Sequence, residues 1–434
     1  MIAYYLQLAL RSFRNAPVLT ALMVLAMGLG IGACMTTLTV YHALAGDPIP
    51  GKSARLFDVQ IDAANMIGYK AGDEPTFQLT RFDAEALLRA KRAQRQVMMS
   101  GADIPVQPAD PAIKPFFASA RYTSADFFAM FEAPFRYGSG WDAQADAAQA
   151  RVVVLSKSLN DRLFGGENSV GRELVVRRES MRVIGVLDSW RPVPHYFDLT
   201  RGAYLDAEDL YLPIATALQL KFGTSGNTNC WGDYGARGPR DLSSPCAWAQ
   251  YWVELASPAD APAFRDYLVQ YSEEQRRAGR FERPANVRLR NVTDHLVFHQ
   301  VLPGDVRLQV WLAFGFLLVC LTNTVGLLLA KCLRRSGEIG VRRALGATRG
   351  AIFAQFLVEA GTLGLAGAAV GLLLAGAGLW LVRQSPADYA PLAQLDGPML
   401  ALTLALAFGA SLLAGLLPAW RAAGVTPARQ LKAQ

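Results

Sequence analysis

Four long stretches of this 434-residue chain contain no Lys, Arg, Asp or Glu, and they constrain its fold more than any other feature. They are 32, 23, 23 and 24 residues long. A helix of about 20 apolar residues crosses the hydrocarbon core of a bilayer. Soluble cores rarely supply four such runs, so the sequence predicts four transmembrane helices. The uncharged runs are residues 15–46, 308–330, 360–382 and 397–420.

The first run has some features of a signal peptide. Arg11 and Arg14 precede it, and Ala43-Leu44-Ala45 resembles a cleavage site. However, its apolar length far exceeds the 7–15 residues that are usual for such peptides. We therefore expect an uncleaved transmembrane helix here.

The net charge of +7 is unevenly distributed along the chain. Residues 1–16, 331–349 and 421–434 carry +2, +5 and +3, whereas 47–306 and 383–396 carry −2 and −1. Positively charged loops stay on the cytoplasmic side of a membrane. Both termini and the 331–349 loop are therefore predicted to be cytoplasmic. The basic pI of 9.2 reflects this sidedness and does not indicate a surface for nucleic acid.

The predicted organisation follows from the spans and the charges. A cytoplasmic amphipathic helix comes first, and a large domain facing outward separates the first two spans. The predicted segments are the amphipathic helix 1–16, the spans 17–46, 307–330, 351–382 and 397–420, the outer domain 47–306, the cytoplasmic loop 331–350, the outer loop 383–396 and the cytoplasmic tail 421–434.

The outer domain has the pattern of an α+β fold with two strand–helix–strand units around an insert. We expect a discontinuous domain whose two halves are residues 50–109 and 251–300, with an insert at 110–250. Thr80 is a candidate helix N-cap. The expected strands are 56–61, 97–99, 251–255 and 287–292, and the expected helices are 81–96 and 258–278.

Five cysteines are divided between the spans and the outer domain. Cys34 and Cys320 lie within spans and Cys332 lies at a cytoplasmic edge. The outer domain contains only Cys230 and Cys246, separated by 15 residues. An oxidising compartment favours a disulfide between them over two unpaired thiols.

We find no pattern that indicates catalysis. No GxxxxGK[ST] phosphate loop or GxSxG elbow occurs, so hydrolysis of ATP by these residues is not expected. His295 and His299 have a spacing that can hold zinc, but Leu296 stands where a zinc peptidase has glutamate. His42 and His195 have no evident partners in the sequence. We therefore predict neither a catalytic residue nor a metal site.

Polar and small residues within the spans suggest helix contacts. Glu359 lies in the third apolar segment, where it is either a functional carboxylate or a side chain that snorkels to the nearby interface or pairs with a nearby arginine. Gly28 with Gly32, and Gly367 with Gly371, form GxxxG spacings that let helix backbones approach closely.

The 331–350 loop is the most informative charged segment. Glu338 and Arg342 form an i,i+4 pair that supports a short helix. Gly346 is placed to end that helix, and Thr348 to cap the next one. The loop either docks onto a cytoplasmic partner or is a solvated, lipid-bound positive loop. The residues alone do not separate these two readings.

Several motifs resemble those of FtsX/MacB-type ABC transporter permeases. The segment 337–360 (GEIGVRRALGATRGAIFAQFLVEA) is similar to the family signature, and 417–431 is similar to its C-terminus. In the insert, Tyr122-Thr-Ser-Ala-Asp-Phe-Phe and Val183-Ile-Gly-Val match MacB-like periplasmic domains. The resemblance covers nearly the whole chain.

The resemblance implies an inner-membrane, multi-pass permease that works as a pair, with an identical or a related second copy. The outer domain would be periplasmic, with porter-like halves. MacB itself carries a fused ATPase that these residues lack, so a separate ATPase subunit that binds ATP and Mg²⁺ is expected, with no cofactor bound by this chain. The residues that would couple to the ATPase are Glu338, Ile339, Arg342, Arg343, Leu345 and Gly346.

Such permeases are thought to transmit movement from the ATPase to the periplasmic domains. The leading expectation is export of a peptide, toxin or antibiotic through a periplasmic adaptor and an outer-membrane channel. The alternatives are a Lol-like permease that releases lipoproteins and a non-transporting, FtsX-like regulator of a cell-wall hydrolase.

Overall fold

The computed structural model describes residues 2–302, 304–385, 389–395 and 397–424. It divides into two compact units. One unit comprises residues 1–45 and 302–434, and the other comprises residues 46–301. The predicted tail at 421–434 lies largely outside the described residues, as do parts of the predicted loop at 383–396.

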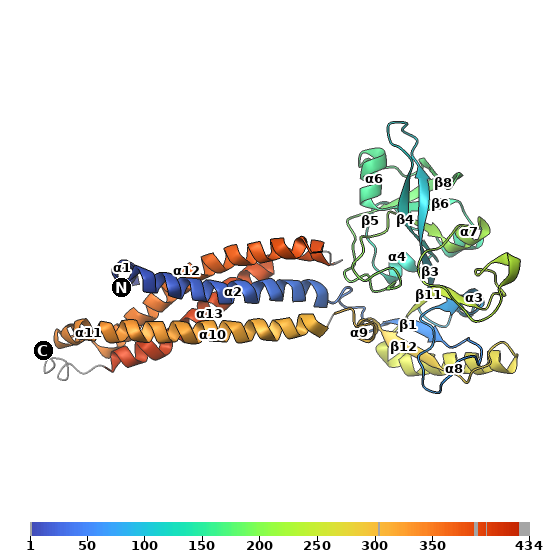
Figure 1. Ribbon diagram of the computed structural model, residues 1–434. Coiled ribbons are helices and arrows are strands. Elements are labelled where there is room, and N and C mark those ends of the chain that lie inside the picture. The colour runs from blue at the N-terminus through green and yellow to red at the C-terminus, as the bar shows by residue number, and fades with distance from the viewer. Residues whose placement is uncertain (1, 303, 386–388, 396, 425–434) are drawn as a thin grey trace. The chain divides into compact units, whose positions relative to one another are not determined.

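The first unit is a helix bundle (Figure 1). In the described residues, four of its helices are long and apolar enough to cross a membrane. Large apolar side chains such as Leu29, Trp311 and Leu373 remain exposed on these helices, which suits a surface that faces lipid. The helices of this unit are α1 (Ile2–Asn15), α2 (Pro17–Ala45), α10 (Gly304–Arg334), α11 (Ser336–Ala344), α12 (Arg349–Arg383), the short η3 (Ala390–Leu392) and α13 (Gly397–Ala423).

Helix α2 lies at the centre of the bundle and contacts α10, α12 and α13. Its residues Met27, Ile31 and Met35 are buried against Leu317 of α10 and Ala375 of α12. Helix α1 packs on α12, and it is the amphipathic helix that the sequence predicts before the first span.

The second unit is built on a twelve-stranded mixed sheet. One part of this unit contains two strand–helix–strand units, one from each end of its sequence. In this part, β1 and β3 both run antiparallel to β11 and lie on either side of it. Two split βαβ units of this kind form a ferredoxin-like half-domain. Its elements are β1 (Leu56–Ile61), β2 (Leu79–Thr80), α3 (Arg81–Ala90), β3 (Arg95–Gln107), β11 (Cys246–Glu254), η2 (Pro258–Asp260), α8 (Ala261–Arg277), β12 (Val287–Asn291) and α9 (Val292–Phe298).

The insert continues the same sheet through β3, which pairs with β11 over its first residues and with β4 over the rest. Strand β7 pairs with both β3 and β8. The elements of the insert are β4 (Phe116–Thr123), α4 (Phe127–Met130), β5 (Phe135–Gly138), α5 (Ala143–Ala147), β6 (Val152–Leu155), α6 (Lys157–Phe164), β7 (Glu173–Val176), β8 (Glu179–Leu187), β9 (Leu210–Pro213), α7 (Ile214–Gln219), β10 (Asn229–Cys230) and η1 (Gly235–Arg237).

Three predicted boundaries of the outer domain are wrong. The helix predicted over 81–96 ends at Ala90, because Lys91 adopts a left-handed conformation. The strand predicted over 97–99 extends over 13 residues, because its second half pairs with β4. Polar residues such as Asp103 interrupt the apolar pattern there, so the sequence does not indicate this extension. The strand predicted from residue 251 begins at Cys246, so the end of the predicted insert belongs to the ferredoxin-like half.

Candidate functional site

The short helix α11 carries most of the residues that the sequence assigns to coupling. It ends before Gly346, whose φ of +99° is a conformation that favours glycine. Thr348 then caps α12, because its hydroxyl accepts a 3.2 Å hydrogen bond from the amide of Ala351. The polypeptide thus makes a compact helical connection between α10 and α12.

Glu338 lies at the centre of an ion-pair network on α11. It pairs with Arg342 at 2.8 Å and accepts a 3.1 Å hydrogen bond from Nε of Arg335. Although partial burial opposes ionisation, the two arginines lower the pKa of the Glu338 carboxyl. Arg342 also donates a 3.1 Å hydrogen bond to Gln355 of α12. Helix α11 is therefore attached to α12 by polar contacts.

A second carboxylate, Glu359, joins three helices at one point. It is only 2% exposed, and Lys331 of α10 and the Ser12 hydroxyl of α1 each donate to its Oε1 at 2.5 Å. Arg335 lies 3.6 Å from its other oxygen and donates a 2.8 Å hydrogen bond to Ser12. A buried carboxylate requires such partners, because an unpaired charge is costly away from water. Through Arg335 this network connects to Glu338 on α11.

The remaining predicted coupling residues divide into buried and exposed groups. Ile339 is 4% exposed and packs in an apolar cluster against α12 and α13, so it anchors α11. Arg343 donates to the carbonyl of Ala423 at 3.4 Å. Leu345, by contrast, is 82% exposed, and Gly346 is exposed beside it. Leu345 and Gly346, which directly follow α11, are thus the exposed members of this group.

The four glycines that the sequence assigns to helix packing lie between α2 and α12. A Cβ added to Gly28 would lie 2.7 Å from Val370, and one added to Gly32 would lie 2.8 Å from Leu374. On the facing helix, a Cβ added to Gly367 would lie 2.9 Å from Met27, and one added to Gly371 would lie 2.8 Å from Ile31. Glycine at these positions allows the two backbones to approach closely.

Two segments of the chain match models of known families. Residues 20–271 match the model of the MacB-like periplasmic core domain, and residues 310–427 match that of the FtsX-like permease C-terminal region. The chain belongs to the family of MacB-like and FtsX-like permeases. With four helices able to span a bilayer among its described residues, it is a multi-pass membrane protein.

Relatives in this family are named as exporters. A macrolide export ATP-binding/permease protein from Rhodospirillum rubrum is 28% identical over 99% of this chain and 60% of its own length. A pyoverdine export ATP-binding/permease protein from Pseudomonas aeruginosa is 24% identical over 72% of this chain and 42% of its own length. The chain thus spans about half the length of the curated relatives that it matches.

Two solved structures are similar to part of this chain. The periplasmic region of MacB from Actinobacillus actinomycetemcomitans is 15% identical and covers 59% of this chain and 96% of its own, with a TM-score of 0.37. The extracellular domain of the ABC-type transporter YknZ from Gram-positive bacteria is 10% identical and covers 54% of this chain and all of its own, with a TM-score of 0.35.

The outer unit contains a disulfide between Cys230 and Cys246, the pair that the sequence proposes. It connects β10 to the start of β11, the two strands in which these residues are partners. The bond closes the loop 231–245, which is rich in Gly, Pro and Ser. Cys34, Cys320 and Cys332 are free and buried.

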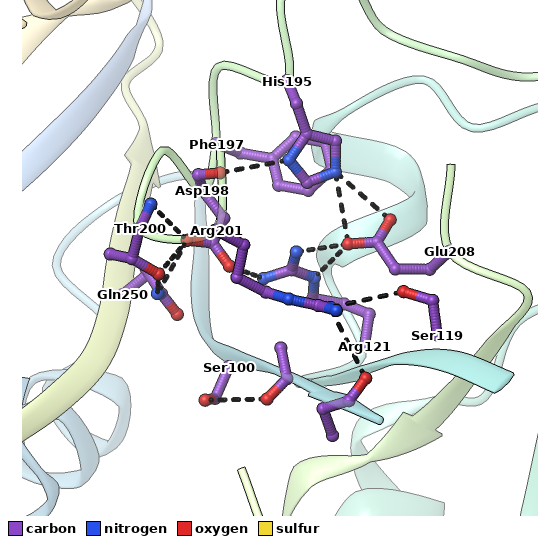
Figure 2. A network of polar contacts seen from close by, with 12 residues as sticks. Ser100, Ser119, Arg121, His195, Phe197, Asp198, Thr200, Arg201, Glu208 and Gln250 are labelled. Carbon is purple, nitrogen blue, oxygen red and sulfur yellow. Dashed lines mark hydrogen bonds and ion pairs between the residues drawn. The ribbon is translucent and has the colours of Figure 1, made fainter. Parts of the chain in front are cut away.

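A buried ion network in the outer unit was not predicted (Figure 2). Arg121 of β4 is fully buried, and it pairs with Asp198 at 2.6 Å and with Glu208. His195, for which the sequence suggests no partner, lies 3.2 Å from Glu208. Burial opposes the ionised form of Asp198 and of Glu208, but Arg121 lowers the pKa of both. The network holds the loop 195–208 against β4.

Sequence reasoning missed these partners because they are distant along the chain. Arg121 and its carboxylates are 77 and 87 residues apart. Ser12 and Glu359 are 347 residues apart. Among the described residues, no three His, Cys, Asp or Glu side chains are grouped as metal ligands would be.

Proposed function

We propose that this chain is the membrane subunit of an ABC-type export system. A separate ATPase that binds ATP and Mg²⁺ acts on α11, and a second permease copy completes the complex. The resulting movement reaches the outer domain through the membrane helices. The relatives named as macrolide and pyoverdine exporters support export as the outcome.

The buried Glu359 network is the observation that carries this proposal. Through Lys331, Ser12 and Arg335, one carboxylate connects α10, α1 and the residue just before α11. A displacement of α11 is therefore passed to these helices rather than absorbed by a flexible loop. Leu345 and Val341, 82% and 56% exposed, are the apolar side chains that α11 offers to the ATPase.

The same proposal includes orientation and cargo. The chain lies in the inner membrane, with residues 1–16, 331–350 and 421–434 in the cytoplasm and residues 47–306 in the periplasm. The charge distribution favours this orientation. The exported molecule is a peptide, toxin or antibiotic that is passed to a periplasmic adaptor and an outer-membrane channel.

Co-purification with an ABC ATPase encoded beside this chain tests the contact with α11. Leu345→Asp places a charge on the exposed end of α11 and is expected to reduce recovery of the ATPase by at least about tenfold, the effect of a buried unpaired charge at an interface. Leu242→Asp makes the same change at an exposed position of the outer unit and should leave recovery unchanged. Equal recovery with both variants would refute the contact.

A further inference from the structure

A groove at one end of the helix bundle is lined by two arginines and two aromatic side chains. It has a volume of about 670 Å³, within the range of sites for small molecules, and lies between the start of α12 and the end of α13. Arg349 and Phe353 line it from α12, and Trp420 and Arg421 line it from α13. All of its lining residues belong to the membrane unit, so a ligand of this groove depends neither on an ATPase nor on which end of the bundle is cytoplasmic.

The two arginines of the groove have no carboxylate partner among the described residues. Their side chains are exposed, and neither forms an ion pair or a hydrogen bond there. Glu338 and Glu359 are the acidic side chains that the described residues place at this end of the bundle. Both are already engaged, because Glu338 pairs with Arg342 and Glu359 pairs with Lys331.

Other charges near the groove are also positive. Arg343 donates a hydrogen bond to the carbonyl of Ala423, which is itself a lining residue. The segment 425–434, which follows the last lining residue, contains Arg429 and Lys432 but no acidic side chain. The groove therefore carries positive charge that the side chains around it do not neutralise.

Trp420 places the groove at the level of the lipid headgroups. It is 69% exposed and is the last residue of the uncharged run 397–420, directly before Arg421. A run of this length spans the hydrocarbon core, so its end lies at the membrane surface, where Trp is enriched. Phe353 packs against the apolar cluster that joins α11, α12 and α13. An apolar wall and two guanidinium groups thus meet where acyl chains give way to phosphate groups.

We propose that this groove binds an anionic phospholipid. Arg349 and Arg421 hold its phosphate group, because a guanidinium matches phosphate oxygens with paired hydrogen bonds. Phe353 and Trp420 contact the glycerol and the upper part of the acyl chains. A zwitterionic lipid also has a phosphate, but its ammonium group would face the same arginines, so the groove favours a headgroup with a net negative charge.

Quenching of Trp420 fluorescence by brominated lipids tests this proposal on the full chain in phosphatidylcholine nanodiscs. The Trp420 signal is the difference between the wild type and Trp420→Phe. Brominated phosphatidylglycerol is expected to quench this signal at a mole fraction at least about tenfold lower than brominated phosphatidylcholine does, the effect of two arginines beside an anionic headgroup.

Two double variants, each also made with Trp420→Phe, locate the preference. Arg349→Gln with Arg421→Gln should remove it, and since both side chains are exposed the melting temperature should not change. Arg11→Gln with Arg14→Gln is the matched control. It removes the same charge from exposed positions of α1, which packs on α12, and should leave the preference intact.

Several outcomes would overturn the proposal. Equal quenching by the two lipids in the wild type would do so, as would loss of the preference in both double variants, which would show only the general attraction of a basic surface. Inorganic phosphate that abolishes the preference at constant ionic strength would assign the groove to a free anion instead. A Trp420 signal shielded from both lipids would assign it to another segment of the chain.

Discussion

Lys331 of α10 and Glu359 of α12 form a 2.5 Å ion pair in which both side chains are at least 95% buried. The pair occurs near the end of α10, where Arg335 and Ser12 also converge on the same carboxylate. Both carboxylate oxygens of Glu359 therefore have partners on other segments of the membrane unit. The main partner of Glu359 is thus Lys331, with Arg335 at a longer distance on its other oxygen.

Glu359→Gln is expected to destabilise the helix bundle. The change leaves Lys331 buried without a countercharge, and breaking a buried pair in this way costs about 3–5 kcal/mol. Glu338→Gln, at an acidic residue that is 45% exposed, should cost no more than about 1 kcal/mol. Thermal unfolding in detergent measures both variants. Equal melting temperatures would contradict the assigned role of Glu359.

Gly371→Ala is expected to loosen the contact between α2 and α12. The added methyl group would lie 2.8 Å from Ile31, and overpacking of this kind costs about 1–3 kcal/mol. Gly376→Ala is the matched control in the same helix, because nothing lies within 4 Å of its Cβ position. Helix stability in detergent should fall for the first variant and not for the second. The reverse order would show that α2 does not pack here.

The Cys230–Cys246 disulfide is expected to stabilise the outer unit. Closing a loop of 15 residues stabilises a fold by about 3 kcal/mol in the chain-entropy model. Cys230→Ser with Cys246→Ser should therefore make the outer unit of the full chain more sensitive to proteases. Mass spectrometry under non-reducing conditions should detect the bond in the wild-type protein. Free thiols at both positions would contradict the pairing.

His299 gives the outer unit a defined response to acid. Its pKa is lowered from 6.5 to about 4, chiefly by burial, so the unfolded chain binds this proton more readily than the folded chain does. His299 therefore has little effect on the free energy of unfolding above pH 6.5. It lowers that free energy as the pH falls from 6.5 towards 4, because only the unfolded chain then binds the proton readily. His299→Gln should lose less stability than the wild type between pH 7 and pH 4.5. A larger loss in the variant would reverse the sign assigned to His299.

The membrane unit could be predicted from the sequence more fully than the outer unit. Long uncharged runs identify the spans because the bilayer excludes charge, and the i,i+4 spacing of Glu338 and Arg342 gives their ion pair directly. The partners of Glu359 could not be predicted, because Ser12 and Lys331 come from two other helices. Local sequence patterns do not determine which helices pack against one another.

In the outer unit, the strands were easier to predict than their pairing. The hydrophobic alternation of residues 56–61 marks β1 correctly. The 13-residue length of β3 was missed, since Gly101, Asp103 and Pro105 interrupt the apolar pattern where β4 pairs with it. The Arg121 network was missed for a related reason, because its members come from a strand and a distant loop.

The central claim is that α11 transmits the action of an ATPase to the helix bundle. Its most direct test is the rate of ATP hydrolysis by the partner ATPase in the reconstituted complex, with wild-type chain, Glu338→Ala and Arg342→Glu. The account predicts that the complex still assembles, since Leu345 is intact, but that both variants reduce the hydrolysis rate by about tenfold or more, as expected when charge-assisted contacts are lost. Hydrolysis at the wild-type rate in both variants would contradict it.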